Sequence, residues 1–180
     1  MTQRKHNLTR RSMCGIGLAA LVAACTDPVA TQQTTAAGLV PAQVSVDVSA
    51  IQGITGREFV RSPQQIQSDV SAALAQQIPT RTAGNADVRI ALREVRLTSP
   101  GNAVAFGGRS RIVALVQILD VRTGAPLRPT KEITGFADQI RPGGLIGAAL
   151  TPSAQADYDQ TLRGFASTVA AQLSAGDTAT

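Results

Sequence analysis

The chain has 180 residues, with 17 lysines and arginines against 12 acidic residues, and a net charge of +5. Four basic residues lie within the first eleven positions, so the remaining thirteen nearly balance the acidic ones, which argues against a nucleic-acid-binding domain. The chain has one histidine, His6, and two cysteines, Cys14 and Cys25, all near the N-terminus. A chain this poor in His and Cys offers few candidates for a catalytic base, a thiol nucleophile or a metal site.

The first 24 residues have the pattern of a bacterial signal peptide. MTQRKHNLTRR is basic, and the apolar run Ser12–Ala24 that follows is shorter than the ~20 residues of a membrane-spanning helix. The small residues Ala23 and Ala24 precede Cys25, and cleavage is expected between Ala24 and Cys25. Residues 1–24 are therefore predicted to be removed.

The stretch VAAC, ending at Cys25, closely resembles the lipobox of bacterial lipoproteins. That resemblance implies a diacylglycerol on the Cys25 thiol and an acyl chain, such as palmitate, on its amino group. It would anchor the protein in a membrane and leave no free thiol. The alternative is an ordinary cleaved signal with Cys25 as a bystander. TRRSM, at Thr9–Met13, resembles the twin-arginine export motif, and the general export route is the alternative.

Residues 25–42 are rich in Thr, Gln and Ala and lack hydrophobic periodicity, which predicts a flexible tether after the lipidated cysteine. Residues 43–175 are long enough for one domain without disulfides or metals. Residues 176–180 are expected to form a disordered tail. No cofactor is expected.

The first two elements of the domain are well marked. In VSVDVSA, alternating valines from Val44 predict a half-buried strand. A helix follows, with Ser62 as N-cap, Pro63 in the first turn and Gln65 completing a capping box. Its apolar face repeats every four residues from Ile66 to Ile78, and Pro79 ends it.

Three strands and a final helix are expected next. In ADVRIALREVRL the inward phase slips between Leu92 and Val95, which predicts a bulge near Arg93–Glu94. The run Ile112–Leu119 is apolar on both faces, as in a central strand covered on each side. A turn with Gly124 at positive φ leads to a return strand over Lys131–Ile140. Thr151–Pro152 is expected to cap a helix whose apolar stripe continues to Leu173.

The predicted order is β-α-β-β-β-α. We expect an α+β two-layer sandwich, with a mainly antiparallel sheet and both helices on one face. The other face is only partly polar, so a partner, a second copy of the chain or the Gly-rich segment 141–150 is expected to cover it.

AVAFGGRSRIVALVQILDVRTGAPL resembles a family of uncharacterised small bacterial envelope lipoproteins. The shared pattern is a G-F-G-x-G-x-S-like turn, a long apolar strand and D-x-x-T-G, and Ala105 replaces the first glycine of that turn. The matching residues here are Phe106, Gly107, Gly108, Ser110, Asp120, Thr123 and Gly124. The resemblance implies an envelope location and no particular activity.

Tests for catalytic chemistry give no site. Phe106–Ser110 lacks the spacing of a phosphate-binding loop and precedes a strand. Asp157 and Asp159 are two apart on a helix and do not share a face, and Asp157 is expected to complement the helix dipole. No ligand cluster suggests a metal. We therefore expect a protein that is not an enzyme.

Residues 88–131 concentrate positive charge, with eight basic residues against Glu94 and Asp120. The candidate contacts for an anionic envelope partner are Arg89, Arg93, Arg109 and Arg111. The alternative is that these arginines are solvated and discourage edge pairing of strands.

The leading hypothesis is a lipid-anchored, non-enzymatic accessory or interaction subunit of a cell-envelope assembly, with an envelope protein as partner. The alternative is a periplasm-facing carrier or sensor of a small or lipidic ligand. Thr26 replaces the aspartate that retains lipoproteins at the inner membrane, so the periplasmic face of the outer membrane is favoured by that resemblance. Asp27 follows one place later.

Overall fold

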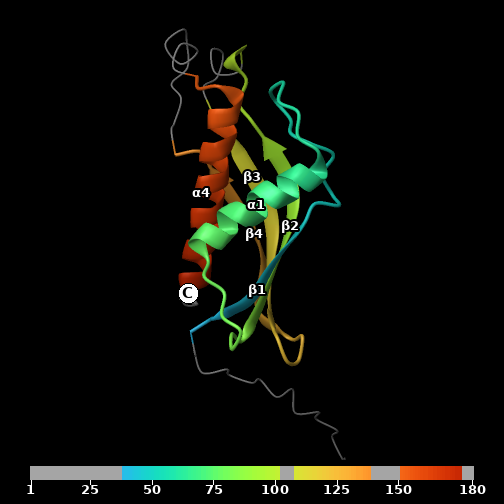
Figure 1. Ribbon diagram of the computed structural model, residues 1–180, viewed down its shortest axis with the longest axis vertical. Coiled ribbons are helices and arrows are strands. Elements are labelled where there is room, and N and C mark those ends of the chain that lie inside the picture. The colour runs from blue at the N-terminus through green and yellow to red at the C-terminus, as the bar shows by residue number, and fades with distance from the viewer. Residues whose placement is uncertain (1–37, 102–107, 139–150, 176–180) are drawn as a thin grey trace, which may run out of the picture. The chain divides into compact units, whose positions relative to one another are not determined.

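The computed structural model describes residues 38–101, 108–138 and 151–175. The predicted signal peptide, Cys25, most of the expected tether, the Gly-rich segment and the tail lie outside them. The helices and strands are β1 (Pro41–Asp47), α1 (Pro63–Gln77), β2 (Ala86–Arg96), β3 (Arg111–Asp120), β4 (Pro126–Phe136) and α4 (Ala154–Ser174). Both helices cover the same side of the sheet (Figure 1), so the predicted α+β sandwich and its order are confirmed.

The strands are arranged in the order β1-β2-β3-β4. β1 runs parallel to β2 and is joined to it through α1, whereas β2, β3 and β4 form an antiparallel meander. β1 begins at Pro41, two residues before the expected domain boundary. The reason lies in the preceding residue, because Val40 donates its N–H to Asn85 Oδ1 at 2.9 Å and accepts from the Asn85 N–H at 2.9 Å.

Helix α1 starts as the sequence predicts. Ser62 Oγ accepts the Gln65 N–H at 3.2 Å, and Gln65 Oε1 accepts the Ser62 N–H at 2.9 Å. This reciprocal pair satisfies two backbone donors that the first turn leaves open. On the side facing the sheet edge, Gln67 Nε2 donates to the Val46 carbonyl oxygen of β1 at 2.7 Å.

The predicted bulge in β2 is confirmed. Leu92 pairs with Ala114 and Glu94 pairs with Val113, so Arg93 is the extra residue. Because of this insertion Leu92 and Val95 both face the core, although they are three residues apart. Arg93 and Glu94 consequently lie together on the face away from the helices.

The turn between β3 and β4 explains the D-x-x-T-G pattern. Asp120 Oδ1 accepts the backbone N–H groups of Arg122 at 3.0 Å and Thr123 at 2.8 Å. Gly124 has the expected positive φ, at 69°. These hydrogen bonds hold the pKa of Asp120 below its ordinary 3.8, the Thr123 N–H being the largest cause.

β4 begins at Pro126, five residues before the expected return strand, and ends at Phe136. The prediction of Lys131–Ile140 was wrong at its start, because the chain already pairs with β3 at Pro126 and Arg128. β4 is an edge strand, where the missing N–H of proline leaves no ladder bond broken.

Helix α4 begins at Ala154, and its N-cap is Ser153, whose Oγ accepts the Ala156 N–H at 3.2 Å. The cap expected at Thr151–Pro152 was therefore placed too early. The helix packs on β4, β3 and α1, and its predicted stripe from Tyr158 to Leu173 is buried.

The core lies between the sheet and the helices, and its side chains are almost entirely Val, Ile, Leu and Ala. Tyr158 and Phe165 are its largest buried side chains. A search of the described ranges finds no helix with the length and hydropathy needed to cross a membrane.

Candidate interaction surface

The sheet has one face that no described helix covers. We call it the open face and define it by its apolar residues, which belong to β2, β3 and β4: Ala91, Val113, Leu115, Leu119 and Phe136. Across the strands Leu115 pairs with Ala91 on one side and with Glu132 on the other. All but Phe136 are half-buried, and Phe136 is 40% exposed. The expectation that β3 is covered on both faces is thus not met by the described residues.

Two of the four candidate arginines on this face are neutralised within the chain. Arg89 Nε lies 2.9 Å from Asp87 Oδ2. Arg111 Nε and Nη2 donate to Glu94 Oε2 at 3.1 and 2.9 Å, and Nη2 also donates to Glu94 Oε1 at 3.3 Å. A planar guanidinium held by both carboxylate oxygens has a fixed orientation. These pairs border the apolar residues and lower the net positive charge predicted for this face.

Arg93 has a different setting. It is exposed on the bulge, and its charge reaches Asp47 at the end of β1. The Ser49 N–H and hydroxyl, and then the Arg93 charge, hold the pKa of Asp47 below its ordinary 3.8. The Arg93 charge on the open face is therefore partly offset by a carboxylate from the neighbouring strand.

Arg109 donates to backbone carbonyls rather than to a carboxylate side chain. Its Nε donates to the Ala137 carbonyl at 3.0 Å and its Nη2 to the Asp138 carbonyl at 3.2 Å. Its guanidinium also lies 5.4 Å from the centre of the Phe136 ring. Arg109 therefore holds the residues that follow β4, and it lies over Phe136, the residue that pairs with Arg111 across the strands.

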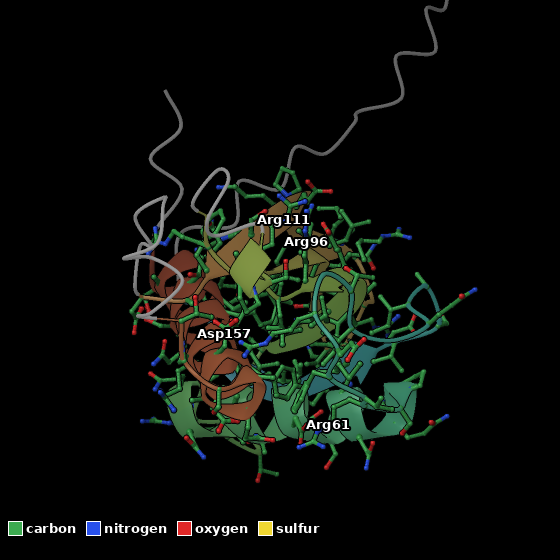
Figure 2. The ribbon with its side chains drawn as sticks, turned by 90° about the horizontal axis from the view of Figure 1, so that it is seen from above. Arg61, Arg96, Arg111 and Asp157 are labelled. Atoms are coloured by element: carbon green, nitrogen blue, oxygen red, sulfur yellow. The ribbon has the colours of Figure 1, made fainter. Side chains whose placement is uncertain are left out.

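The pairing of strands adds an arginine that the sequence analysis did not select. Arg96, the last residue of β2, is opposite Arg111, and Figure 2 shows the two close together where β2 ends and β3 begins. Of these two arginines, Arg111 is the one that pairs with Glu94. Only the register of β2 against β3 shows that Arg96 and Arg111 are neighbours.

A buried polar network lies on the other side of the sheet and was also missed. Asp157, in the first turn of α4, is fully buried, and its Oδ2 accepts the Ser110 hydroxyl at 2.6 Å. Ser110 Oγ in turn accepts the Thr98 N–H at 2.9 Å. Asp157 therefore does more than complement the helix dipole, because it joins α4 to the residues that end β2 and begin β3.

The groove between α1 and α4 holds charges of both signs. It has a volume of about 240 Å³, and Arg61, Asp69, Asp159 and Arg163 are among the residues that line it. Asp69 Oδ2 accepts the Tyr158 hydroxyl at 3.2 Å, and Arg61 lies 3.6 Å from the same oxygen. No cluster of three potential metal-ligating side chains occurs in the part of the chain that the structure describes.

We predict that Tyr158 stays protonated in the folded domain above pH 10. Burial, followed by the Asp69 charge, raises the pKa of Tyr158 well above its ordinary 10.0. Since the unfolded chain ionises at about 10 and the folded one does not, stability should fall as pH rises above 10. Tyr158 is the only tyrosine, so the tyrosinate absorbance band reports on it alone. Ionisation near pH 10 in the folded protein would contradict this, and Tyr158→Phe should remove this part of the pH dependence.

Comparison with known proteins gives no family. No protein-family model matches the chain, and no curated protein matches it. Similar solved structures include a protein named as a putative lipoprotein from Caulobacter crescentus, with 15% identity, a TM-score of 0.37 and coverage of 73% of this chain and 87% of that one. A DUF330 protein from Xanthomonas campestris has 11% identity, a TM-score of 0.40 and coverages of 76% and 85%.

A third structure, a PelC dodecamer from Paraburkholderia phytofirmans, has 12% identity, a TM-score of 0.37 and coverages of 78% and 93%. At these identities and TM-scores, the similarities assign no function to this chain.

Proposed function

We propose that this chain is a lipid-anchored, non-enzymatic interaction subunit of a bacterial cell-envelope assembly, and that it binds its protein partner through the open face. The observation that carries the proposal is that face: half-buried apolar side chains cross three strands and are bordered by the pairs Arg89–Asp87 and Arg111–Glu94. Apolar side chains surrounded by ordered charges are the arrangement of many protein–protein contacts.

The anchor in this proposal is Cys25, which follows the lipobox. The new N-terminus would carry acyl chains, and Thr26 favours the periplasmic face of the outer membrane. Two or more acyl chains anchor stably, since each buried methylene contributes ~0.8 kcal/mol.

The carrier hypothesis receives less support from the hollows that the described residues form. One hollow between the sheet and α4 has an apolar floor of Val116, Ile118 and Ile133, with Arg128 and Lys131 beside it, and a volume of about 180 Å³. Sites for small molecules usually have volumes of roughly 300–1,000 Å³. A bound lipid would need more room than this hollow offers.

The anchor is tested by the intact mass of the protein from its host's membranes. We expect a chain that begins at Cys25 and carries acyl groups, and an unacylated product when Cys25→Ser is expressed. Cys14→Ser is the matched control, because the second cysteine lies in the predicted signal and its loss should leave the mature mass unchanged. An unmodified chain in the soluble fraction would contradict the proposed lipid anchor.

The partner face is tested by site-specific photocrosslinking in the host envelope. A photoreactive side chain at Leu115 should give a discrete adduct, and one at Val60, a 91% exposed residue before α1, should not. Leu115→Arg should reduce recovery of that partner at least tenfold, since a charge placed in a contact centre is costly, with an unchanged melting temperature. Identical adducts at both positions would remove the open face from the proposal. An adduct with a second copy of the chain would make the assembly a homo-oligomer.

A further inference from the structure

The topology brings several chain segments to one end of the domain. We call it the basal end and define it by residues 38–41, 79–85, 120–131 and 172–175. Backbone bonds hold these segments together: Arg81 donates its N–H to the Pro41 carbonyl at 2.9 Å, and Val121 donates to the Asn85 carbonyl at 3.1 Å. Arg128 Nη1 reaches the Gln172 carbonyl of α4 at 2.9 Å. In Figure 1 this end is at the bottom of the domain.

The charge of the basal end is positive. Its basic residues are Arg81, Arg122, Arg128 and Lys131, and Asp120 is its one acidic residue. Asp120 is engaged in its own turn by backbone N–H groups. Arg128 and Lys131 meet the C-terminal end of α4, whose partial negative charge they offset. Arg81 and Arg122 are exposed, and they carry the outward charge of this end.

An apolar side chain projects beside these charges. Val121, at the start of the β3–β4 turn, is 48% exposed, and among the large apolar side chains of the described residues only Val60 is more exposed. Leu39 and Leu127 are half-buried at the same end. Exposed apolar residues with neighbouring Arg and Lys are typical of surfaces that lie at the headgroup level of a membrane.

The connection from Cys25 enters the domain at the basal end as well. The described residues begin at Gly38, at the basal end, and Cys25 precedes Gly38 by thirteen residues. Even fully extended, thirteen residues span only about 45 Å. A bilayer that holds acyl chains on Cys25 is therefore always within reach of this end.

We infer that the basal end docks on anionic phospholipid headgroups, with Arg81 and Arg122 at the phosphates and Val121 at the boundary with the acyl chains. This inference rests on the proposed anchor at Cys25. The charge sign, the exposed valine and the thirteen-residue connection to Cys25 support it together. The open face would then stand away from the bilayer surface, free for a protein partner.

The test uses the acylated protein reconstituted into vesicles of phosphatidylcholine, with or without phosphatidylglycerol, each doped with a nitroxide-labelled lipid. A fluorophore is attached to Val121→Cys, and in a second sample to Val60→Cys, whose neighbours Phe59 and Arg61 contact the N-terminal half of α4. We expect quenching at position 121 in the anionic vesicles only, and none at position 60. An unquenched probe at 121, or equal quenching at both positions, would overturn the inference.

Charge variants sharpen the result. Each basic residue close to an anionic surface contributes about fivefold to binding, so Arg81→Gln with Arg122→Gln should weaken docking about 25-fold and abolish the quenching at 121. Arg93→Gln with Arg163→Gln removes two other exposed charges and should leave it unchanged. Added salt should weaken docking as the Arg81/Arg122 double substitution does, because it screens the attraction between the arginines and the headgroups.

Failure of the anchor is distinguished by the intact mass of the same sample. Acylated protein with an unquenched probe at position 121 overturns the docking and leaves the proposed function intact. If the mass shows no acyl groups, the proposed function fails. Co-sedimentation of that chain with the anionic vesicles, lost in the Arg81/Arg122 variant alone, would then still support the basal end, and its absence would overturn it.

Discussion

Gly135→Ala should destabilise the domain by about 3 kcal/mol, near the upper end of the usual cost of overpacking a core. Gly135 lies in β4 where α4 crosses it, and an added Cβ would lie only 2.7 Å from Phe165 Cβ and 2.9 Å from its nitrogen. Because these atoms belong to the helix backbone and its first side-chain carbon, α4 would have to move as a whole. Thermal unfolding should show a melting temperature lower by about 10 °C for a domain of this size.

The matched control is Gly101→Ala. An added Cβ at Gly101 meets no atom within 4 Å, so the melting temperature should change little. Gly164, on the facing side of α4, would place a Cβ against the Phe136 carbonyl, and Gly164→Ala should behave like Gly135→Ala. Glycine inside a helix normally costs stability, and here it permits the close approach of helix and strand. A Gly135→Ala protein as stable as the Gly101→Ala protein would contradict this account.

Asp157→Ala should also cost about 3 kcal/mol. The substitution removes the acceptor of a 2.6 Å hydrogen bond and leaves the Ser110 hydroxyl without it in a fully buried position. A hydrogen bond to a charged group contributes ~1.5–3 kcal/mol, and a buried polar group left unpaired adds to the loss. Urea unfolding of both proteins gives the difference directly.

A double-mutant cycle separates the contribution of the Ser110–Asp157 hydrogen bond to stability from the effect of burying each side chain. Ser110→Ala alone should cost less than Asp157→Ala, and the two together should cost clearly less than their sum, because they remove one shared interaction. Asp157→Asn retains an oxygen acceptor for Ser110 and should keep part of the stability. Strictly additive effects would show that the Ser110–Asp157 contact contributes nothing.

The features that the sequence predicted well are those encoded within a few residues. The capping box at Ser62 and Gln65, the turn at Asp120 and the bulge after Leu92 each depend on local backbone geometry, and the structure contains all three. The fold class followed from these elements because alternating strands and two apolar helices have few ways to bury their apolar faces.

The partners of the charged residues could not be predicted from the sequence in the same way. Glu94 and Arg111 are 17 positions apart and meet only because the bulge at Arg93 fixes the register of β2 against β3. Ser110 and Asp157 are 47 positions apart, on a strand start and a helix. The sequence did contain one indication of this polar network. Asp157 and Thr161 are one helical turn apart and flank the apolar stripe of α4, and the structure shows both side chains buried.

The early start of β4, whose first residues include Pro126 and Pro129, also has a physical reason. Proline is excluded from central strands, but sequence alone does not reveal which strand will be at the edge. Of the candidate contact residues Arg89, Arg93, Arg109 and Arg111, Arg109 donates to the carbonyls of Ala137 and Asp138. These partners follow the next strand, so the sequence does not reveal them.

The outer strands of the sheet restrict how another chain can associate with it. On β1 the Val46 carbonyl is already taken by Gln67, and on β4 Pro126 and Pro129 have no N–H to offer. β-Augmentation, in which a foreign strand extends the sheet through its backbone, therefore finds both borders poorly suited. In the proposed complex, recognition would then come from side chains, and a point substitution on the open face would change the choice of partner without altering the sheet itself.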